Sequence, residues 1–482
     1  MNKDGIQLEM RFENDANRFR NRLENGIFSV FIEIGVPSRK TDFNTALAQF
    51  SDFDFAVSKI DYLHAALAIT DKAQAADSWN VADFASGLIN SQRDNHLIYL
   101  SGRNTSLGEL RETMELCRAS GFKNVIPVSG DALPGEGAKE TAAKTFTESV
   151  HLHKVSVIKE GDNEKSILNA GCVFNPFKYT PQDIYPQYFK LIKKLAHGAN
   201  FIVTQAGWDM LKLQELRWHL THRGLHYPSI ARLLLLTPEK VTMIANGKLP
   251  GIHISPDFQG VLEKEVKYSR AQFESAQWRR IQLQAAGARL LGYSGVQIAG
   301  LTSAYQAQVA CRRISEALEE FKDFNDWKNA YQEHFSRMEM APYPHRFYMF
   351  DKLFTRAHLD SVPKMKEGKL PECTKTEKLQ HKLREFLFSH SHKQPSDEHS
   401  ISKRLFADCK GCSYCRLPLT QYICPELCPK GLSNGPCGGT KADGSCELSS
   451  KECVHTIRMR LATWLNEIDT LEELYIEPAA KQ

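Results

Sequence analysis

The sequence lacks the features that mark a secreted or membrane-spanning protein. It has no run of about 18 apolar residues, and its first residues, MNKDGIQLEMRFEND, hold no apolar signal-peptide region. It also lacks a charge bias, because 61 basic and 57 acidic side chains are mixed along the chain and the net charge is only +4. Such a balance disfavours nucleic acid as a partner. We therefore expect a cytoplasmic protein that binds neither a membrane nor nucleic acid.

A further absence concerns the first apolar run, which no Gly-x-Gly-x-x-Gly motif follows. This disfavours an open sheet of the dinucleotide-binding kind. Eight short apolar runs alternate with longer amphipathic stretches, and they lie at 28–35, 62–70, 96–101, 124–130, 167–174, 199–205, 230–236 and 295–301. Eight strands over about 300 residues predict the α/β class and a (β/α)8 TIM barrel. A doubly wound open sheet is the alternative.

Composition divides the chain into three parts. With 42% hydrophobic residues among 482, it has room for more than one folded unit. Residues 1–325 carry the barrel pattern, and residues 326–400 read as a helical and flexible linker region that becomes polar at its end. Residues 401–482 form a small cysteine-rich domain with a closing helix expected over 457–474. We interpret His390 and His392 as solvated linker residues rather than metal ligands.

Eight of the twelve cysteines gather in the last part of the chain. Thiols so crowded in a reducing compartment are more often metal ligands than disulfides. The Cys-x2-Cys-x2-Cys spacing that starts at Cys409 is typical of a [4Fe–4S] cluster whose fourth ligand is a remote Cys followed by Pro. Four cysteines also form closed zinc sites, so two clusters, one cluster plus zinc, and zinc alone all stay open. The candidate ligands are Cys409, Cys412, Cys415, Cys424, Cys428, Cys437, Cys446 and Cys453.

Candidate catalytic residues follow from the barrel, because chemistry in this fold lies at the carboxyl ends of the strands. The residues of interest at those ends are polar, except for one glycine, and they are Glu33, Thr70, Asp71, Ser129, Gly130, Asp131, Thr204 and Gln205. Apolar neighbours surround Glu33, so we expect desolvation to raise its pKa and to make it a general acid near neutrality. Two plainer interpretations are that Glu33 is satisfied by a backbone or arginine partner, and that Asp131 caps the next helix.

These residues in this order resemble the methylenetetrahydrofolate reductase family, whose members are flavin-containing (β/α)8 barrels. The resemblance covers about residues 25–320. Its motifs are Glu33 with Pro37, Thr70-Asp71, Ser129-Gly130-Asp131 with Pro-Gly-Glu-Gly at 134–137, and the segment 194–200 that runs into Thr204-Gln205. The tail from Cys424 to Gly439 resembles the cysteine domain that is attached to, or encoded beside, some bacterial reductases of this family.

The resemblance implies a role for each matching residue. Glu33 stands where the family's general acid protonates N10 of the substrate, Asp131 where an Asp contacts the pterin and tunes the flavin, and Gln205 where an amide reads the pterin ring. The implied flavin contacts are Thr70, Asp71, Gly130, Asn175, Lys193 and Lys194. The implied activity is that of an oxidoreductase that uses FAD, or FMN, to interconvert 5,10-methylenetetrahydrofolate and 5-methyltetrahydrofolate.

Four places depart from the family pattern, and the first is Ile34-Gly35-Val36-Pro37, where the family usually carries aromatic residues and a second proline. Tyr99-Leu100-Ser101 replaces a stretch that normally offers a histidine to the flavin, Ser303 stands near a family arginine, and residues 233–238 offer no aromatic ring for nicotinamide. We therefore expect electrons to pass through the cysteine domain to a redox partner, a ferredoxin or a flavoprotein, within an oligomer or complex. The alternative is a non-catalytic electron-transfer adaptor on a degenerate barrel. A zinc-thiolate methyltransferase is disfavoured, because no Cys or His motif lies at a strand end.

Overall fold

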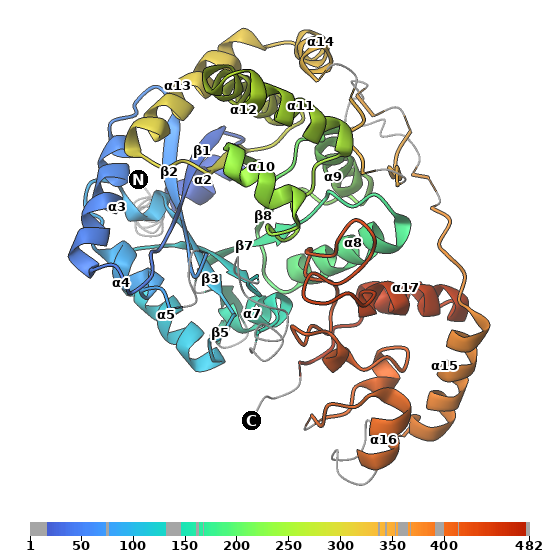
Figure 1. Ribbon diagram of the computed structural model, residues 1–482. Helices are drawn as coiled ribbons and strands as arrows, with labels where there is room; N and C mark the ends of the chain where they lie inside the picture. Colours follow the sequence, from blue (N-terminus) through green and yellow to red (C-terminus); the bar gives the residue numbers. More distant parts are fainter. Residues whose placement is uncertain are drawn as a thin grey trace, which may run out of the picture.

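The computed structural model (Figure 1) describes most of the chain. The described residues are 17–73, 77–131, 146–160, 163–166, 168–335, 338–342, 345–351, 353–354, 365–366, 368–390, 400–412 and 414–478. The motif expected at 134–137 and His392 lie outside these residues.

Eight parallel strands close into a barrel in the order β1-β10-β9-β8-β7-β4-β3-β2. The strands are β1 (Ser29–Gly35), β2 (His64–Thr70), β3 (Leu97–Ser101), β4 (Asn124–Val128), β7 (Asn169–Phe174), β8 (Phe201–Thr204), β9 (Ser229–Leu234) and β10 (Gly295–Ala299). Each coincides with one of the eight apolar runs. The predicted TIM barrel is thus confirmed, and the open-sheet alternative is wrong.

Helices surround this barrel and link its strands (Figure 1). They are α2 (Arg18–Glu24), α3 (Phe43–Ser58), α4 (Val81–Ser86), η1 (Arg93–Asn95), α5 (Leu107–Ala119), α7 (Ser149–Ser156), α8 (Pro181–Ala196), α9 (Met210–His222), α10 (Pro238–Ala245), α11 (Pro256–Tyr268), α12 (Arg270–Leu290) and α13 (Ala304–Glu320). Side-chain caps start many of them: at α5, Ser106 and Glu109 form a reciprocal capping box. A short antiparallel pair, β5 (Val157–Glu160) and β6 (Asn163–Ser166), follows α7.

Apolar side chains fill the interior of the barrel and close its amino-terminal end. Inward-facing residues such as Phe31, Phe201 and Ile230 pack in one cluster with two residues of α2, Phe19 and Leu23. The Phe19 ring lies 5.2 Å from the Phe31 ring and 4.9 Å from the Phe201 ring, measured between centroids. Because α2 plugs this end, the open end of the barrel is the one formed by the carboxyl ends of the strands.

The barrel body continues beyond the boundary expected at residue 325. Helix α14 (Phe324–His334) packs on α12, and the main hydrophobic core includes its Trp327 and, farther along, Phe350. The cysteine-rich part contains α15 (Lys375–Phe388), α16 (Ser400–Ala407), η4 (Leu417–Leu419), η5 (Pro425–Leu427), α17 (Val454–Leu465) and α18 (Ile468–Glu473). The closing helix is therefore split in two, because Asn466 takes a left-handed φ of 59°. No helix in the described ranges is long and apolar enough to cross a membrane.

The cysteine domain docks on the barrel beside α8 (Figure 1). Glu148, just before α7, accepts hydrogen bonds from the backbone N–H of Ser433 (2.9 Å) and Asn434 (2.9 Å) and from Asn434 Nδ2 (3.2 Å). The Asn434 side chain also exchanges two hydrogen bonds of 2.7 Å with the backbone of Ile476. A buried carboxylate that accepts three hydrogen bonds is a strong anchor, and it places the loop around residue 434 over the mouth of the barrel.

Candidate active site

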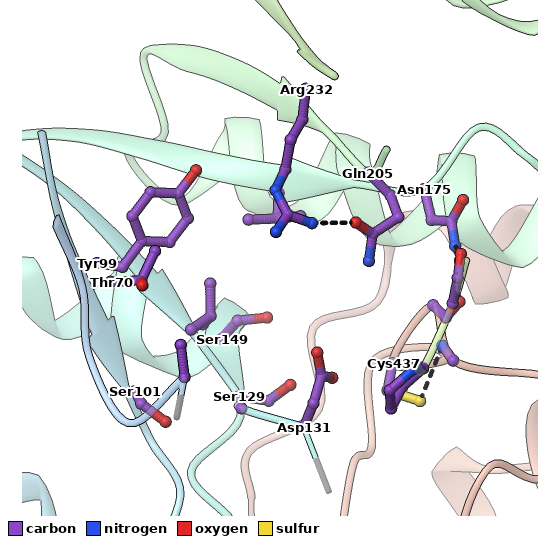
Figure 2. Close-up of a pocket in the computed structure, with 18 of the residues that line it drawn as sticks. Thr70, Tyr99, Ser101, Ser129, Asp131, Ser149, Asn175, Gln205, Arg232 and Cys437 are labelled. Carbon is purple, nitrogen blue, oxygen red and sulfur yellow. Dashed lines mark hydrogen bonds between the residues drawn. The ribbon is translucent and has the colours of Figure 1, made fainter. Parts of the chain in front are cut away.

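A cavity of about 310 Å³ opens at the carboxyl ends of the strands (Figure 2). Its barrel wall includes eight of the nine barrel residues expected at the site, namely Glu33, Thr70, Asp71, Gly130, Asp131, Asn175, Lys194 and Gln205. Its other wall comes from the cysteine domain and contains Cys437 within the turn 436–439. Figure 2 shows Cys437 at one side of the cavity and Tyr99 at the other. Residues far apart in sequence thus share one enclosed space.

Strand periodicity explains why the barrel side chains point inward. Successive side chains of a strand alternate between its faces, so a residue two positions after an interior residue is also interior. Glu33 follows Phe31 by two positions, Arg232 follows Ile230, and Gln205 follows Val203, which also faces the interior. A polar layer therefore stands directly above the apolar filling of the barrel.

Glu33 and Arg232 form the centre of this polar layer. Arg232 Nε donates to Glu33 Oε2 and Arg232 Nη2 donates to Glu33 Oε1, both at 2.6 Å. Gln297 Nε2 donates to Glu33 Oε2 at 2.6 Å, and Gln297 Oε1 accepts a hydrogen bond of 2.7 Å from the Tyr99 hydroxyl. Four side chains from four strands thus form a connected network whose only full negative charge is Glu33.

The ionisation of Glu33 differs from the expectation. Burial alone would raise the pKa of Glu33, but the charge and hydrogen bonds of Arg232, together with the hydrogen bond from Gln297, lower that pKa below its ordinary value. The predicted raised pKa is therefore wrong for the protein without substrate. The plainer interpretation, an arginine partner, is the one that the geometry shows, and Glu33 is an ionised carboxylate.

Gln205 is fixed by the same arginine. Its Oε1 accepts from Arg232 Nη1 at 2.6 Å and from the backbone N–H of Ala206 at 2.9 Å. Because the carbonyl oxygen is held on both sides, the amide nitrogen is turned toward the open space, as Figure 2 shows. Gln205 therefore presents a hydrogen-bond donor to any ligand in the cavity.

Thr70 and Asp71 close the cavity at the end of β2. Thr70 Oγ1 donates to the Ile34 carbonyl at 3.2 Å, and Asp71 Oδ2 accepts from the Ser101 backbone N–H at 3.1 Å. Burial raises the pKa of Asp71 to about 6, although the nearby Lys72 and the hydrogen bond from Ser101 oppose the shift. Asp71 is thus a titratable group near neutrality in the cavity wall.

Gly130 and Asp131 meet a lysine from the cysteine domain. Gly130 has φ of 85°, and a Cβ there would lie 2.7 Å from Ser101 Oγ, so only glycine fits. Lys430 Nζ donates to the Gly130 carbonyl at 2.7 Å and lies 3.3 Å from Asp131 Oδ1. Lys430 also pairs with the buried Glu447. The Asp131 side chain remains mostly exposed, and the residues 132–145 that follow it lie outside the described ones, so its role as a helix cap stays a prediction.

One face of α8 supplies further polar groups. Gln187, Lys190 and Lys194 line the cavity at positions i, i+3 and i+7 of the helix. Lys194 Nζ donates to the Val173 carbonyl at 2.7 Å, and burial lowers the pKa of Lys194 to about 8. Gln187 Nε2 is buried and has no hydrogen-bond partner among the described residues. An unpaired buried donor in a cavity wall indicates a ligand that supplies the acceptor.

Lys193 does not line this cavity, although it was expected at the site. Burial, and to a lesser extent the charge of Arg458, lower its pKa to about 7.

Asn175 does line the cavity, but its Nδ2 donates to the carbonyls of Gly251 (3.0 Å) and Gly438 (2.8 Å), and its Oδ1 accepts from the Phe177 N–H (3.0 Å). Asn175 therefore fastens the cysteine domain to a barrel loop.

Ser303, which stands near the position of an arginine in the family, has a local structural role. Ser303 is the N-cap of α13 and accepts the backbone N–H of Gln306 at 3.2 Å. It lies outside the residues that line the cavity.

The eight cysteines form two quartets. The first, Cys409, Cys412, Cys415 and Cys424, surrounds a small void beside the buried Lys403. The second is Cys428, Cys437, Cys446 and Cys453, where burial, together with the neighbouring Cys453 and Cys446, raises the pKa of the Cys428 thiol to about 12. Within the described ranges no group of three or more His, Cys, Asp or Glu has the geometry of a metal-ion site. Metal ligation by these thiols stays a prediction.

Comparison with known proteins places the chain in a family. A model described as methylenetetrahydrofolate reductase matches residues 19–272, and one described as methylene-tetrahydrofolate reductase C terminal matches residues 389–481. No curated protein matches the chain. A solved structure titled as an uncharacterized protein from Clostridium thermocellum that binds two copies of 5-methyl-5,6,7,8-tetrahydrofolic acid is 12% identical, with a TM-score of 0.42 over 62% of this chain and 99% of that one.

The 7,8-dihydropteroate synthase of Vibrio fischeri ES114 is 9% identical, with a TM-score of 0.33 over 62% of this chain and 95% of that one. The reductase model alone spans more than half of the sequence, and it covers the strands that carry Glu33, Gln205 and Arg232. The chain therefore belongs to the methylenetetrahydrofolate reductase family and carries that family's C-terminal domain.

Proposed function

We propose that the protein is a flavin-dependent methylenetetrahydrofolate reductase that exchanges electrons through its cysteine domain. One observation carries the proposal: the network around Glu33 and a cysteine of the second quartet, Cys437, line the same cavity. Family membership supports folate as the substrate. The cysteine in the wall supports an electron route that does not need a nicotinamide site in the barrel.

The cavity residues fit a flavin. Gln187 Nε2 is a buried donor that finds no partner in the described part of the chain, Lys190 and Lys194 bring positive charge, and Thr70 also lines the cavity. These groups suit the oxygen- and nitrogen-rich edge of a flavin ring and its phosphates. When bound, the flavin would supply hydride transfer to the one-carbon unit. We propose FAD, and FMN would satisfy the same contacts.

Folate would be oriented by the polar layer over the barrel filling. The Gln205 amide nitrogen is the donor that faces the cavity, and Arg232 holds that amide in place. Asp131 lies exposed at the rim, where a carboxylate can accept hydrogen bonds from a pterin. Both residues are therefore proposed as substrate-binding groups.

Glu33 is proposed as the proton donor to N10, and its pairing with Arg232 controls when it can act. In the protein without substrate Glu33 is ionised, because the arginine lowers its pKa. A folate that draws Arg232 away weakens this stabilisation and raises the pKa of Glu33. Protonation of Glu33 would then be linked to substrate binding. Gln297, which donates to Glu33 and accepts from Tyr99, keeps the carboxyl oriented during the change.

The quartets are proposed as ligands of two [4Fe–4S] clusters. The first quartet combines Cys409, Cys412 and Cys415 with Cys424, which is followed by Pro425, as the spacing predicts for one cluster. Each cluster would supply one-electron transfer. Zinc at one or both quartets is the alternative, and the amounts of iron, sulfide and zinc per chain in anaerobically purified protein decide between them. About eight irons indicate two clusters, about four irons with one zinc indicate a mixed domain, and zinc alone removes the electron route.

The test is a visible spectrum of anaerobically purified protein before and after addition of 5-methyltetrahydrofolate. Bleaching of a flavin band shows that the barrel binds folate and exchanges hydride with it, and bleaching of a broad iron–sulfur band shows that electrons move onward. We expect Glu33→Gln to keep its flavin and lose this response, whereas the exposed Glu24→Gln keeps both. A protein without flavin, or with flavin indifferent to folate, would instead be the electron-transfer adaptor.

A further inference from the structure

Helices α15 and α16 expose an apolar surface that the described part of the protein leaves uncovered. We call it the α15–α16 patch, and its side chains, with their exposed fractions, are Leu379 (69%), Leu383 (41%), Phe386 (84%), Ile401 (82%), Leu405 (74%) and Phe406 (40%). In α15 the first three recur at i, i+4 and i+7, so they form one stripe on the outer side of the helix. The opposite side, with His381 and Phe388, is buried. A contiguous apolar surface on a folded protein marks an interaction site.

Basic side chains outnumber acidic ones in the two segments that carry the patch. The described segments 375–390 and 400–412 hold seven Lys or Arg and three Asp or Glu, and of the seven only Lys403 is buried, beside the first quartet. Lys382 and Arg404 are exposed and lie on the same helical faces as the apolar stripes. One of the three acids, Glu377, is paired with Arg460. The surface therefore complements a partner with an apolar contact zone and an acidic rim.

The patch adjoins the first quartet, which is the outer one. Cys409 and Cys412 follow α16 directly and are partly exposed, and α15 and α16 lie at the end of the cysteine domain away from the barrel (Figure 1). Phe388 of α15 and Ala407 of α16 pack in one cluster with Cys415 and Cys424. Because the side of α15 that faces this cluster is opposite to its apolar stripe, a protein bound on the stripe would lie one helix diameter, about 10 Å, from the first quartet.

The first quartet is joined to the second by one short turn. Cys424 of the first and Cys428 of the second flank η5 (Pro425–Leu427), a single turn of 3₁₀ helix. At about 2 Å rise per residue, their backbones are roughly 8 Å apart. Cys437 of the second quartet lines the barrel cavity. The two quartets therefore form a continuous path from the surface to the cavity.

We propose that the α15–α16 patch is the docking surface of a small acidic one-electron carrier protein. The proposal rests on the proposed reductase function. Reduction of 5,10-methylenetetrahydrofolate needs two electrons and two protons: one C–H bond forms, the bond between N10 and the one-carbon unit breaks, and N10 takes a proton. Two reduced carriers, bound in succession, would each give one electron to the iron–sulfur cluster that is proposed at the first quartet.

The test measures binding as well as activity, on the full chain with its metal centres. Phe386→Glu and Leu405→Glu each place a negative charge in the patch, and both side chains are so exposed that folding should not change. Tyr268→Glu is the matched control, because Tyr268 is 80% exposed at the end of α11 on the barrel. With a reduced bacterial ferredoxin as the probe, we expect at least a tenfold loss of ferredoxin affinity and of ferredoxin-driven reduction in the patch variants and no change in Tyr268→Glu. Added salt should weaken ferredoxin binding to the unmodified protein.

Reduced methyl viologen separates this proposal from the reductase function, because so small a donor needs no docking surface. If methyl viologen drives folate reduction equally in all variants while only the patch variants lose ferredoxin binding, the patch is the docking site. If the unmodified protein does not bind ferredoxin, or if the patch variants bind it as well as Tyr268→Glu does, the docking proposal is overturned. A dimer in sedimentation that Phe386→Glu dissociates without changing ferredoxin affinity also overturns it. Failure of methyl viologen to drive any folate reduction overturns the reductase function instead.

Discussion

Arg232 donates hydrogen bonds to both carboxylate oxygens of Glu33 across the mouth of the barrel, with two donor–acceptor distances of 2.6 Å. The two residues are 199 positions apart in sequence and come from β9 and β1. Two-pronged pairs of this kind fix geometry as well as charge. The candidate acid of this family member is therefore held as an anion by its arginine.

Removal of the arginine should reverse the ionisation of Glu33. In Arg232→Gln, burial remains and the opposing charge is lost, so the pKa of Glu33 should move above its ordinary value. In the unmodified protein the lowered pKa adds stability that is present above the unfolded pKa and is lost as pH falls through the folded pKa. In the variant this pH dependence has the opposite sign: ionisation of the buried Glu33 opposes folding, so the free energy of unfolding falls as pH rises. The measurement is the free energy of unfolding between about pH 4 and 8.

Arg279→Gln is the control for this change, because Arg279 makes an equally two-pronged pair with Glu320 at an exposed site, with distances of 2.7 and 2.8 Å. Its loss should change stability by less than about 1 kcal/mol and should depend little on pH. A destabilisation of Arg232→Gln that is the same at every pH would show that the arginine does not control the charge of Glu33.

The contribution of Asp71 to stability should depend on pH in the opposite direction to that of Glu33 in the unmodified protein. Burial raises its pKa to about 6, so the folded state disfavours the ionised form. This penalty is absent below the unfolded pKa and complete above about pH 6. Asp71→Asn removes it, and we expect the variant to gain about 1–2 kcal/mol at pH 7 and nothing near pH 4, since Asp71 is partly exposed. Thermal unfolding at the two pH values measures the difference, and an equal gain at both would contradict the assignment.

The strands of the barrel were predictable because each buries an apolar run, and burial leaves a local signal in the sequence. The residues at the centre of the site were harder to predict from the sequence. Arg232 lies inside one of those apolar runs, so a single charged residue there does not stand out in the sequence as a candidate site residue. Its position two residues after Ile230 was the available signal, since that parity directs it inward. The raised pKa expected for Glu33 failed for the same reason, because its partner is distant in sequence.

Helix geometry explains the mixed outcome for the lysines. Lys193 and Lys194 are consecutive, and neighbours on a helix point about 100° apart, so both rarely line one cavity. A step of four residues back from Lys194 leads to Lys190, and a further step of three leads to Gln187; both line the cavity.

The division of the eight cysteines into two quartets could be predicted only in part from the sequence. Cys424 and Cys428 both precede proline, and their assignment to different quartets depends on the path of the loops between them.

The docking of α14 on the barrel should depend on a glycine. A Cβ at Gly287 of α12 would overlap the buried ring of Trp327, which is further held by a 2.7 Å hydrogen bond from its Nε1 to the Leu283 carbonyl. Gly287→Ala should therefore destabilise the protein by about 1–3 kcal/mol. Gly260→Ala in α11 is the matched control, since nothing lies within 4 Å of that position, and it should stabilise by about 0.5–1 kcal/mol. Denaturant unfolding compares the two, and equal effects would show that Trp327 adapts.

The anchor of the cysteine domain should fail when Glu148 becomes neutral. Its carboxylate accepts two backbone N–H groups, of Ser433 and Asn434, and the Asn434 amide. Glu148→Gln keeps the shape but turns an NH2 group toward these donors, so docking should lose about 2–3 kcal/mol. Faster hydrogen exchange of the backbone amides around 430–440 would report the loss, whereas Glu24→Gln, in an exposed pair with Arg20, should leave that exchange unchanged. Because this docking helps to hold Cys437 at the cavity, Glu148→Gln should also slow the proposed electron exchange between the cysteine domain and the barrel while both stay folded. Unchanged exchange in the variant would mean that the other contacts to the barrel, from Lys190 to the Gly435 and Pro436 carbonyls and from Asn175 to the Gly438 carbonyl, are sufficient to hold the loop.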